Sequence, residues 1–185
     1  MQDLLHLPET GYRTLPWKNG AGRTDEIWLW PPGADRDAFS IRISRAPIPQ
    51  DGAFSSFQGA DRVITVIEGL GLDLDFGPEA RRLEPLDPFR FDTALAPVGR
   101  PLGGAVRVFN VMADRRDWRI VGAGLARAGD SVTAGLLVIL ALEAQRIRIG
   151  QADRALAAQD TAVCRAAGPV RLGGRALAVR LEPAA

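Results

Sequence analysis

The sequence is poor in the two residues that most often build metal and nucleophilic sites. Its 185 residues include one cysteine, Cys164, and one histidine, His6. A single cysteine excludes an intramolecular disulfide framework and a zinc site built from several thiolates, and it indicates a reducing compartment. A single histidine cannot supply a multi-histidine metal site, and a serine or cysteine hydrolase would depend on it alone. We therefore predict no metal and no cofactor, and interpret His6 as a packing or surface residue.

An excess of charge of one sign is also missing. The 23 Lys and Arg residues balance the 22 Asp and Glu residues, leaving a formal net charge of +1. Such a balanced chain has no strong positive electrostatic field to attract nucleic acid or an anionic membrane, so we expect neither as a partner. The N-terminus has no basic segment followed by an apolar one, and the longest apolar run, residues 132–142, is too short to cross a bilayer. We expect a cytoplasmic protein whose charged ligands are met by local groups.

The chain predicts many short strands. Twenty glycines and 13 prolines leave little room for long helices. In residues 39–46 the apolar Ile41 and Ile43 alternate with the polar Arg42 and Ser44, which is typical of a strand with two different faces. The other predicted strands are residues 24–30, 62–67, 70–76, 105–112, 118–121, 132–142, 145–149 and 175–181. The pattern predicts an all-β sandwich or barrel with little helix.

A faint internal repeat indicates two related lobes. Gly77 aligns with Gly150, and Asp87 with Asp160, both at a separation of 73 residues. In each case a strand is followed by a glycine turn and then by a turn that carries aspartate. Coincidence among common residue types is the alternative interpretation.

Residues 16–27 concentrate tryptophan, glycine and polar side chains directly before a predicted strand. Lys18 and Asn19 offer donors suited to a carboxylate, and Gly20 lets the backbone approach a ligand. The segment is not a phosphate loop, because the Gly-x-x-x-x-Gly-Lys-Ser/Thr pattern is missing and a strand follows instead of a helix. The alternative is a tight turn in which Trp17 fills the core.

Along the following strand, alternation places Thr24 and Glu26 on the same face as Trp28 and Trp30. That face could line a cavity or simply cover a lobe, and we favour lining for Thr24 and Glu26. Glu26 is the one carboxylate that we consider as a general base, since a buried glutamate near cations could activate water or a substrate proton. No paired acid accompanies it.

Four sequence blocks resemble the HutD/Ves family. They are Pro-Trp-Lys-Asn-Gly at residues 16–20, Phe-x-x-Arg-x-Ser at 39–44, Asp-Gly-x-Phe-Ser-x-Phe-x-Gly-x-Asp-Arg at 51–62 and Phe-Asn-Val-Met at 109–112. The blocks follow the family's order between residues 4 and 116. Two positions depart from the family pattern: Ala21 stands where glycine is usual, and Val108 where aspartate is frequent.

The resemblance implies a bacterial protein with a double-cupin fold, in which two β-barrel lobes are fused. We expect residues 1–185 to form one such unit, with an N-terminal lobe over residues 1–115 that holds the pocket and a C-terminal lobe over residues 116–185. In the HutD branch, the resemblance also implies an association with histidine utilisation.

Side-chain cations are the expected receptors for an anion. Arg42, beside Ser44 on a polar strand face, suits a barrel lumen, and a guanidinium binds a carboxylate through two parallel hydrogen bonds. Asn110 adds a directional donor or acceptor. Arg62 is a further candidate, but it could instead form a structural ion pair with Glu68 on the same strand face. The predicted ligand-binding residues are Trp17, Lys18, Asn19, Gly20, Thr24, Glu26, Arg42, Ser44, Arg62 and Asn110.

These residues favour a binding protein over an enzyme. From the family context, the ligand is an anionic intermediate of histidine degradation, N-formylglutamate or urocanate, and the first matches several cations better because it has two carboxylates. One alternative is a metal-independent enzyme with Glu26 as proton shuttle. Another is a structural or protein-interaction role without a ligand. A homodimer formed through edge strands is also expected.

Overall fold

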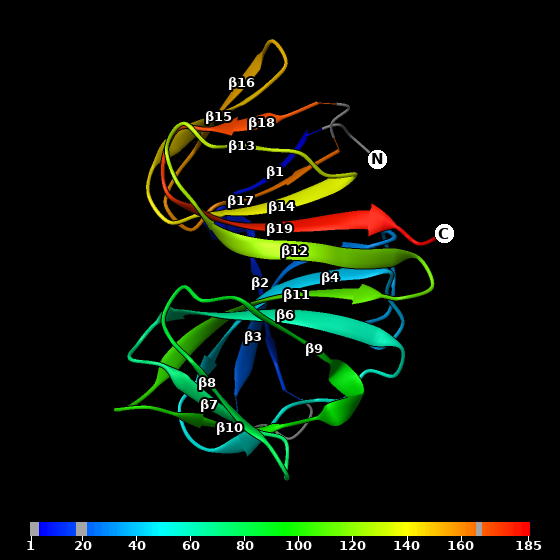
Figure 1. The fold of residues 1–185 in the computed structure, drawn as a ribbon, viewed down its shortest axis with the longest axis vertical. Helices are drawn as coiled ribbons and strands as arrows, with labels where there is room; N and C mark the ends of the chain where they lie inside the picture. The colour runs from blue at the N-terminus through cyan, green and yellow to red at the C-terminus, as the bar shows by residue number, and fades with distance from the viewer. Residues whose placement is uncertain (1–3, 18–21, 166–167) are drawn as a thin grey trace. The chain divides into compact units, whose positions relative to one another are not determined.

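The computed structural model describes residues 4–17, 22–165 and 168–185, and strands account for most of their regular structure (Figure 1). The described residues form only two helical elements, the short 3-10 helices η1 (Glu9–Gly11) and η2 (Thr93–Leu95). This confirms the predicted all-β fold with little helix. The chain divides into two compact units, Arg13–Trp118 and Arg119–Ala185, and the second unit also includes the N-terminal segment through Tyr12.

The unit Arg13–Trp118 contains a six-stranded and a four-stranded sheet, and its strand pairs are antiparallel. In spatial order, the large sheet consists of β2 (Arg13–Pro16), β3 (Arg23–Trp30), β4 (Ile41–Ile48), β11 (Val106–Asp114), β6 (Ala60–Glu68) and β9 (Phe89–Asp92). The small sheet consists of β5 (Gly52–Ala53), β10 (Val98–Pro101), β7 (Leu72–Asp75) and β8 (Ala80–Leu83). Ile64 and Val66 of the large sheet pack with Leu72, Leu74 and Leu83 of the small sheet in one buried core.

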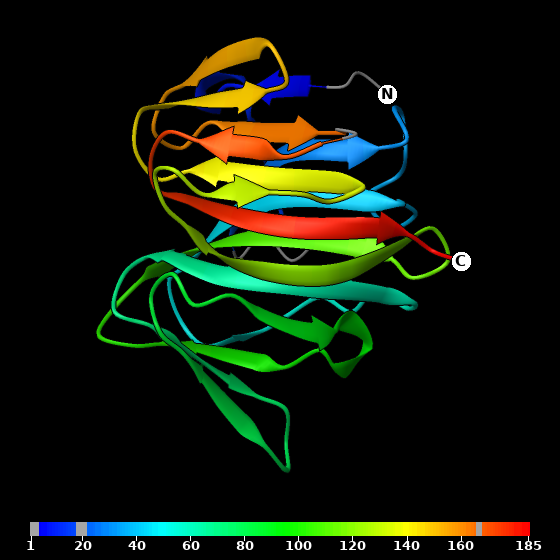
Figure 2. The same ribbon diagram turned by 45° about the horizontal axis from the view of Figure 1, so that its top comes forward.

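The second unit also contains a large and a small sheet, of five and four strands (Figure 2). Its large sheet consists of β1 (Leu4–Leu7), β17 (Thr161–Cys164), β14 (Leu136–Ala141), β19 (Ala176–Pro183) and β12 (Trp118–Ala126). Its small sheet consists of β13 (Ser131–Val132), β18 (Val170–Leu172), β15 (Gln145–Ile149) and β16 (Ala152–Leu156). Residues 132–142, predicted as one strand, are split between β13 and β14.

The first strand belongs to this second unit, although we expected residues 1–115 to form one lobe. β1 pairs with β17, and Asp160, the residue before β17, anchors the N-terminal segment that contains β1. The Asp160 Oδ2 atom lies 2.7 Å from His6 Nε2, and its Oδ1 atom accepts a hydrogen bond of 2.9 Å from the Glu9 amide. His6 is therefore part of the structural contact that holds the N-terminal segment.

The two units repeat the same topology. The order β4-β11-β6-β9 in one corresponds to β12-β19-β14-β17 in the other, and β5-β10-β7-β8 corresponds to β13-β18-β15-β16. Gly77 and Gly150 both adopt positive φ, at 94° and 58°. Leu86 and Gln159, also 73 residues apart, both adopt positive φ, at 65° and 71°. The shared topology and the matching turns support the predicted internal repeat.

Candidate functional site

A pocket of about 580 Å³ lies within the unit Arg13–Trp118. Side chains of β3, β4, β6 and β11 line it, together with residues 49–57. Among the predicted ligand-binding residues, the structure brings six to its wall: Trp17, Thr24, Arg42, Ser44, Arg62 and Asn110. This arrangement is consistent with the expected place of the site, in the N-terminal lobe.

Strand register explains why the polar residues meet. On β11, Asn110 lies opposite Ser44 of β4, and Met112 lies between Arg42 of β4 and Arg62 of β6. Residues directly opposite one another in a sheet point to the same face, and residues two apart on one strand do so as well. Three neighbouring strands therefore direct two arginines, a serine and an asparagine into one pocket.

An irregularity in β3 corrects one predicted face. The register between β3 and β4 shifts between Glu26 and Trp28, so that Glu26 lies opposite Ser44 but Trp28 lies opposite Ile43. Because one extra residue in a bulge reverses the alternation, Trp28 and Trp30 point away from the face that carries Glu26. The prediction that all of these side chains share one face was wrong for the two tryptophans.

Arg62 is a buried cation without a carboxylate partner among the described residues. Arg62 is 5% exposed. Its Nη2 atom donates one hydrogen bond of 3.3 Å to the Ser55 carbonyl, and its Nε atom has no hydrogen-bond partner among the described residues. Its guanidinium carbon lies 5.2 Å, 5.9 Å and 5.7 Å from the ring centroids of Phe54, Phe57 and Phe91. Burial and the charge of Arg42 lower the pKa of Arg62 to about 9.

The proposed ion pair between Arg62 and Glu68 was wrong. The Glu68 Oε2 atom lies 3.4 Å from Arg107 Nε instead. Six residues separate Arg62 from Glu68 along β6, which corresponds to about 20 Å at roughly 3.3 Å per residue in a strand. Sharing a strand face is therefore not enough to bring these two side chains together.

Arg42 shares its counter-ion with a second arginine. The Glu26 Oε2 atom lies 3.5 Å from both Arg42 Nε and Arg36 Nε, and none of these three atoms has a hydrogen-bond partner among the described residues. Arg42 and Glu26 are buried, whereas the Arg36 side chain is one-third exposed. Burial, followed by the charge of Arg36, lowers the pKa of Arg42. Glu26 does not line the pocket itself, but it balances two arginines that do.

Trp17 closes another part of the wall. Its indole Nε1 donates a hydrogen bond of 2.8 Å to Thr24 Oγ1, and its amide donates one of 2.9 Å to the Gly22 carbonyl. A Cβ atom on Gly22 would lie 2.8 Å from the indole, so this glycine is needed where the ring packs against it. Three other predicted residues of the segment lie outside the residues that the structure describes: Lys18, Asn19 and Gly20.

The model of the HutD family matches residues 9–179, which is most of the chain. The chain belongs to the HutD family. An uncharacterized 21.2 kDa protein in the hutC 3' region of Pseudomonas putida is 41% identical over 113 residues, or 60% of this chain. The match spans 59% of that relative's length.

Solved structures agree with the HutD assignment. A conserved protein of unknown function, PA5104 from Pseudomonas aeruginosa PAO1, is 31% identical with a TM-score of 0.86, covering 98% of this chain and 100% of that one. HutD from Pseudomonas fluorescens SBW25, in a formate condition, is 29% identical with a TM-score of 0.81, covering 97% and 98%. A cupin 2 conserved barrel domain protein from Leptotrichia buccalis shares the fold at 10% identity, with a TM-score of 0.52 and coverage of 85% and 87%. The predicted double-cupin fold is confirmed.

The HutD-type blocks also contribute residues that we did not predict for the site. Phe54 and Phe57, both from the block at residues 51–62, line the pocket and contact arginine side chains. Arg36 comes from the loop before β4, outside every block. Asp61, from the block at residues 51–62, lies within β6, where its carboxylate binds Arg115 at 2.8 Å. The signal that could have identified the two phenylalanines is that they stand in the same block as Arg62.

The described residues include no group of three or more His, Cys, Asp and Glu that could hold a metal ion. In the part of the chain with an assigned structure, no helix has the length and hydropathy needed to span a membrane. The pocket lining contains three arginines, hydroxyl and amide side chains, and the carboxylates of Asp37 and Asp51. Asp37 is also an electrostatic neighbour of Arg42, whereas Arg62 has no carboxylate partner among the described residues. Arginine side chains bind anionic ligands through charge-assisted hydrogen bonds.

Proposed function

We propose that this member of the HutD family binds a small carboxylic acid in the pocket of the unit Arg13–Trp118. The observation that carries the proposal is the burial of Arg62 without a counter-ion among the described residues. Holding an unpaired charge away from water costs several kcal/mol. A ligand carboxylate would supply the missing charge and accept hydrogen bonds from the free guanidinium N–H groups.

N-formylglutamate suits this pocket better than urocanate. Arg62 provides one cationic point, and the pair of Arg36 and Arg42, whose Nε atoms both lie 3.5 Å from Glu26 Oε2, provides a second. A ligand with two carboxylates can use both points, whereas a ligand with one carboxylate leaves one of them unused. The relative from Pseudomonas putida lies in the hutC 3' region, which supports a role for this ligand in modulating histidine utilisation.

Calorimetric titration of the purified protein tests the proposal. N-formylglutamate, urocanate, glutamate and histidine are titrated separately, each in the same buffer. We expect saturable binding of N-formylglutamate, with an affinity at least about tenfold higher than that of the other three, or about 1.4 kcal/mol. Absence of binding by all four acids would overturn the proposed function, and binding of urocanate alone would overturn the choice of ligand.

The affinity for N-formylglutamate should fall as the pH rises above 9. The pKa of Arg62 is lowered to about 9 by burial and by the charge of Arg42, whereas the ligand carboxylates remain ionised throughout. Affinity should be constant below this pH and decrease by up to about tenfold per pH unit above it. Titrations at several pH values, with circular dichroism to verify the fold, measure the effect; a constant affinity up to pH 10.5 would contradict it.

The same pKa shift has the opposite effect on the stability of the empty protein. Since the pKa of Arg62 is lower in the folded than in the unfolded state, the unfolded state binds more protons in the window from about pH 9 up to the ordinary pKa of an arginine. The penalty for burying this charge is full below about pH 9 and decreases as the pH rises through that window. Arg62 therefore makes the folded protein less stable at neutral pH, where the anion binds best.

Replacement of Gly99 by alanine should weaken the binding of N-formylglutamate by displacing the Phe54 ring. A Cβ atom on Gly99 would lie 2.5 Å from Phe54 Cε2, so the ring that contacts Arg62 must move. We expect a roughly tenfold loss of affinity for N-formylglutamate, comparable to the loss of one cation–π contact. Gly124→Ala is the matched control, because a Cβ atom there meets nothing within 4 Å. Equal affinities in the two variants would refute the role of Phe54.

A further inference from the structure

Phe57 contacts both buried arginines of the pocket. Its ring centroid lies 5.6 Å from the guanidinium carbon of Arg42 and 5.9 Å from that of Arg62. Among the described aromatic residues, it is the one ring that contacts both guanidinium groups. Phe39 packs against it edge-on, with the ring centroids 5.6 Å apart and an interplanar angle of 66°. The ring is therefore supported by one neighbour while it contacts two cations.

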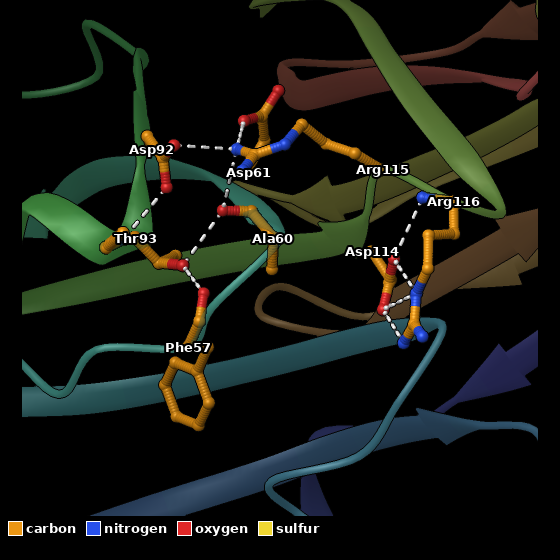
Figure 3. A network of polar contacts seen from close by, with 9 residues as sticks. Phe57, Ala60, Asp61, Asp92, Thr93, Asp114, Arg115 and Arg116 are labelled. Carbon is orange, nitrogen blue, oxygen red and sulfur yellow. Dashed lines mark hydrogen bonds and ion pairs between the residues drawn. The ribbon is translucent and has the colours of Figure 1, made fainter.

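The backbone that carries this ring is fixed by Thr93. The fully buried Thr93 hydroxyl contacts the Phe57 carbonyl and donates a hydrogen bond of 2.8 Å to the Ala60 carbonyl (Figure 3). The Ala60 amide in turn donates a hydrogen bond of 3.3 Å to the Phe57 carbonyl. Figure 3 shows the Phe57 ring pointing away from this carbonyl, so the hydroxyl holds the backbone without touching the ring.

Arg115 also holds the turn between Phe57 and Ala60, through two ion pairs and a backbone hydrogen bond. Arg115 Nη1 lies 2.8 Å from Asp61 Oδ1 and 3.0 Å from Asp92 Oδ2, which links the start of β6 to the residue before Thr93 (Figure 3). The Arg115 amide also donates a hydrogen bond of 2.9 Å to the Gly59 carbonyl. The turn between Phe57 and Ala60 is thus held at several points, which is more than an ordinary surface turn needs.

Two like charges buried in one pocket repel each other. Contacts with the protein must therefore hold the two guanidinium groups in position. An aromatic ring attracts a cation to the face of its π system, so one ring that contacts two cations restrains the position of both. The Phe57 ring contacts both guanidinium groups, and its backbone is held by a buried hydroxyl. Its position therefore bears directly on where each guanidinium can bind a carboxylate.

We infer that Phe57 is a specificity-determining residue: its ring, positioned through Thr93, keeps the Arg42 and Arg62 guanidinium groups apart so that the pocket selects acids with two carboxylates. The inference rests on the proposed function. Phe57 itself supplies no hydrogen bond to the ligand carboxylates. Loss of the ring should therefore affect the choice between ligands rather than the ability to bind a single carboxylate.

The experiment compares N-formylglutamate with N-formylglutamine, in which an amide replaces the second carboxylate. The wild-type protein should favour N-formylglutamate by at least about tenfold. Phe57→Leu and Thr93→Val should bring the ratio of the two dissociation constants close to one, because the two guanidinium groups lose their fixed spacing. Phe57→Tyr keeps an aromatic ring and Thr93→Ser keeps the hydroxyl, so both should retain the wild-type ratio.

Each outcome decides a different point. Wild-type protein that binds neither ligand overturns the proposed function, and the inference with it. Binding with an unchanged ratio in Phe57→Leu and Thr93→Val overturns the inference alone. An equal loss of both ligands together with a lower Tm would assign Phe57 a purely structural role, which also overturns it. If Phe57→Leu does not fold, Thr93→Val decides the question, because it keeps the Phe57 side chain and removes only the hydroxyl that positions it.

Discussion

Replacement of Arg62 by methionine should abolish binding of N-formylglutamate without lowering the Tm. Arg62 is 5% exposed, has no carboxylate partner among the described residues, and donates only one long hydrogen bond, to Ser55. Removing the receptor for one carboxylate should reduce affinity by at least about a hundredfold, or about 2.7 kcal/mol. Methionine fills similar space among Phe54, Phe57 and Phe91 and avoids the cost of a buried charge. Calorimetric titration and thermal unfolding measure the two effects.

Arg100→Met is the matched control for this substitution. Arg100 belongs to the same unit, but it is about half exposed and pairs with Asp75 at 2.8 Å and Asp51 at 3.4 Å. An exposed ion pair contributes at most about 1 kcal/mol, so this variant should keep both its fold and its affinity. An Arg62→Met protein that still binds N-formylglutamate as tightly as the Arg100→Met protein would contradict the assigned anion receptor.

Replacement of Glu26 by glutamine should cause the largest loss of stability among these variants. Glu26 is the carboxylate that lies 3.5 Å from both Arg36 and Arg42, and removing its charge takes away the ion-pair partner of buried Arg42 and leaves Asp37 as a remaining acidic neighbour. Breaking a buried ion pair by removing one partner costs about 3–5 kcal/mol. Urea unfolding of the empty protein should show a loss of this size. N-formylglutamate should restore part of it, because its second carboxylate replaces the lost charge.

Glu68→Gln provides the comparison, since Glu68 is half exposed and pairs with Arg107 at 3.4 Å. We expect a loss of no more than about 1 kcal/mol for this variant. The Glu26→Gln protein also separates the binding account from the enzymatic alternative. If the wild-type protein consumes the acid, and Glu26→Gln stops consumption while affinity stays intact, Glu26 acts as a proton shuttle and the binding account is wrong.

Local alternation was sufficient to predict much of the pocket wall. The polar face of residues 39–46 placed Arg42 and Ser44 together, and β4 carries both into the pocket. Asn110 followed from its family block, and the register of β11 places it opposite Ser44. The strand face of Arg42 and Ser44 could be predicted because side chains of a regular strand alternate strictly between two faces. The internal repeat could also be detected, because turns of the same type keep the same spacing.

The rest of the site depends on irregular structure and on contacts distant in sequence. One bulge before Trp28 reversed the face of the two tryptophans, and alternation alone cannot locate such a bulge. Arg36 reaches Glu26 from a loop, where no periodic pattern fixes its direction. The Thr93 hydroxyl and the Phe57 carbonyl, 36 residues apart, meet only in the folded chain. For Arg62, an ion pair with Glu68 on its own strand was the alternative to ligand binding, whereas its neighbours in the structure include three aromatic rings.

Arg62 has no counter-ion among the described residues, and the proposed function assigns it the role of receiving a ligand carboxylate. A crystal structure of the protein with N-formylglutamate tests this claim most directly. The account predicts a carboxylate paired with the Arg62 guanidinium at about 2.8 Å, the usual distance for a charge-assisted hydrogen bond, and the second carboxylate beside Arg42. A ligand bound elsewhere, with Arg62 still bonded only to the Ser55 carbonyl, would contradict it.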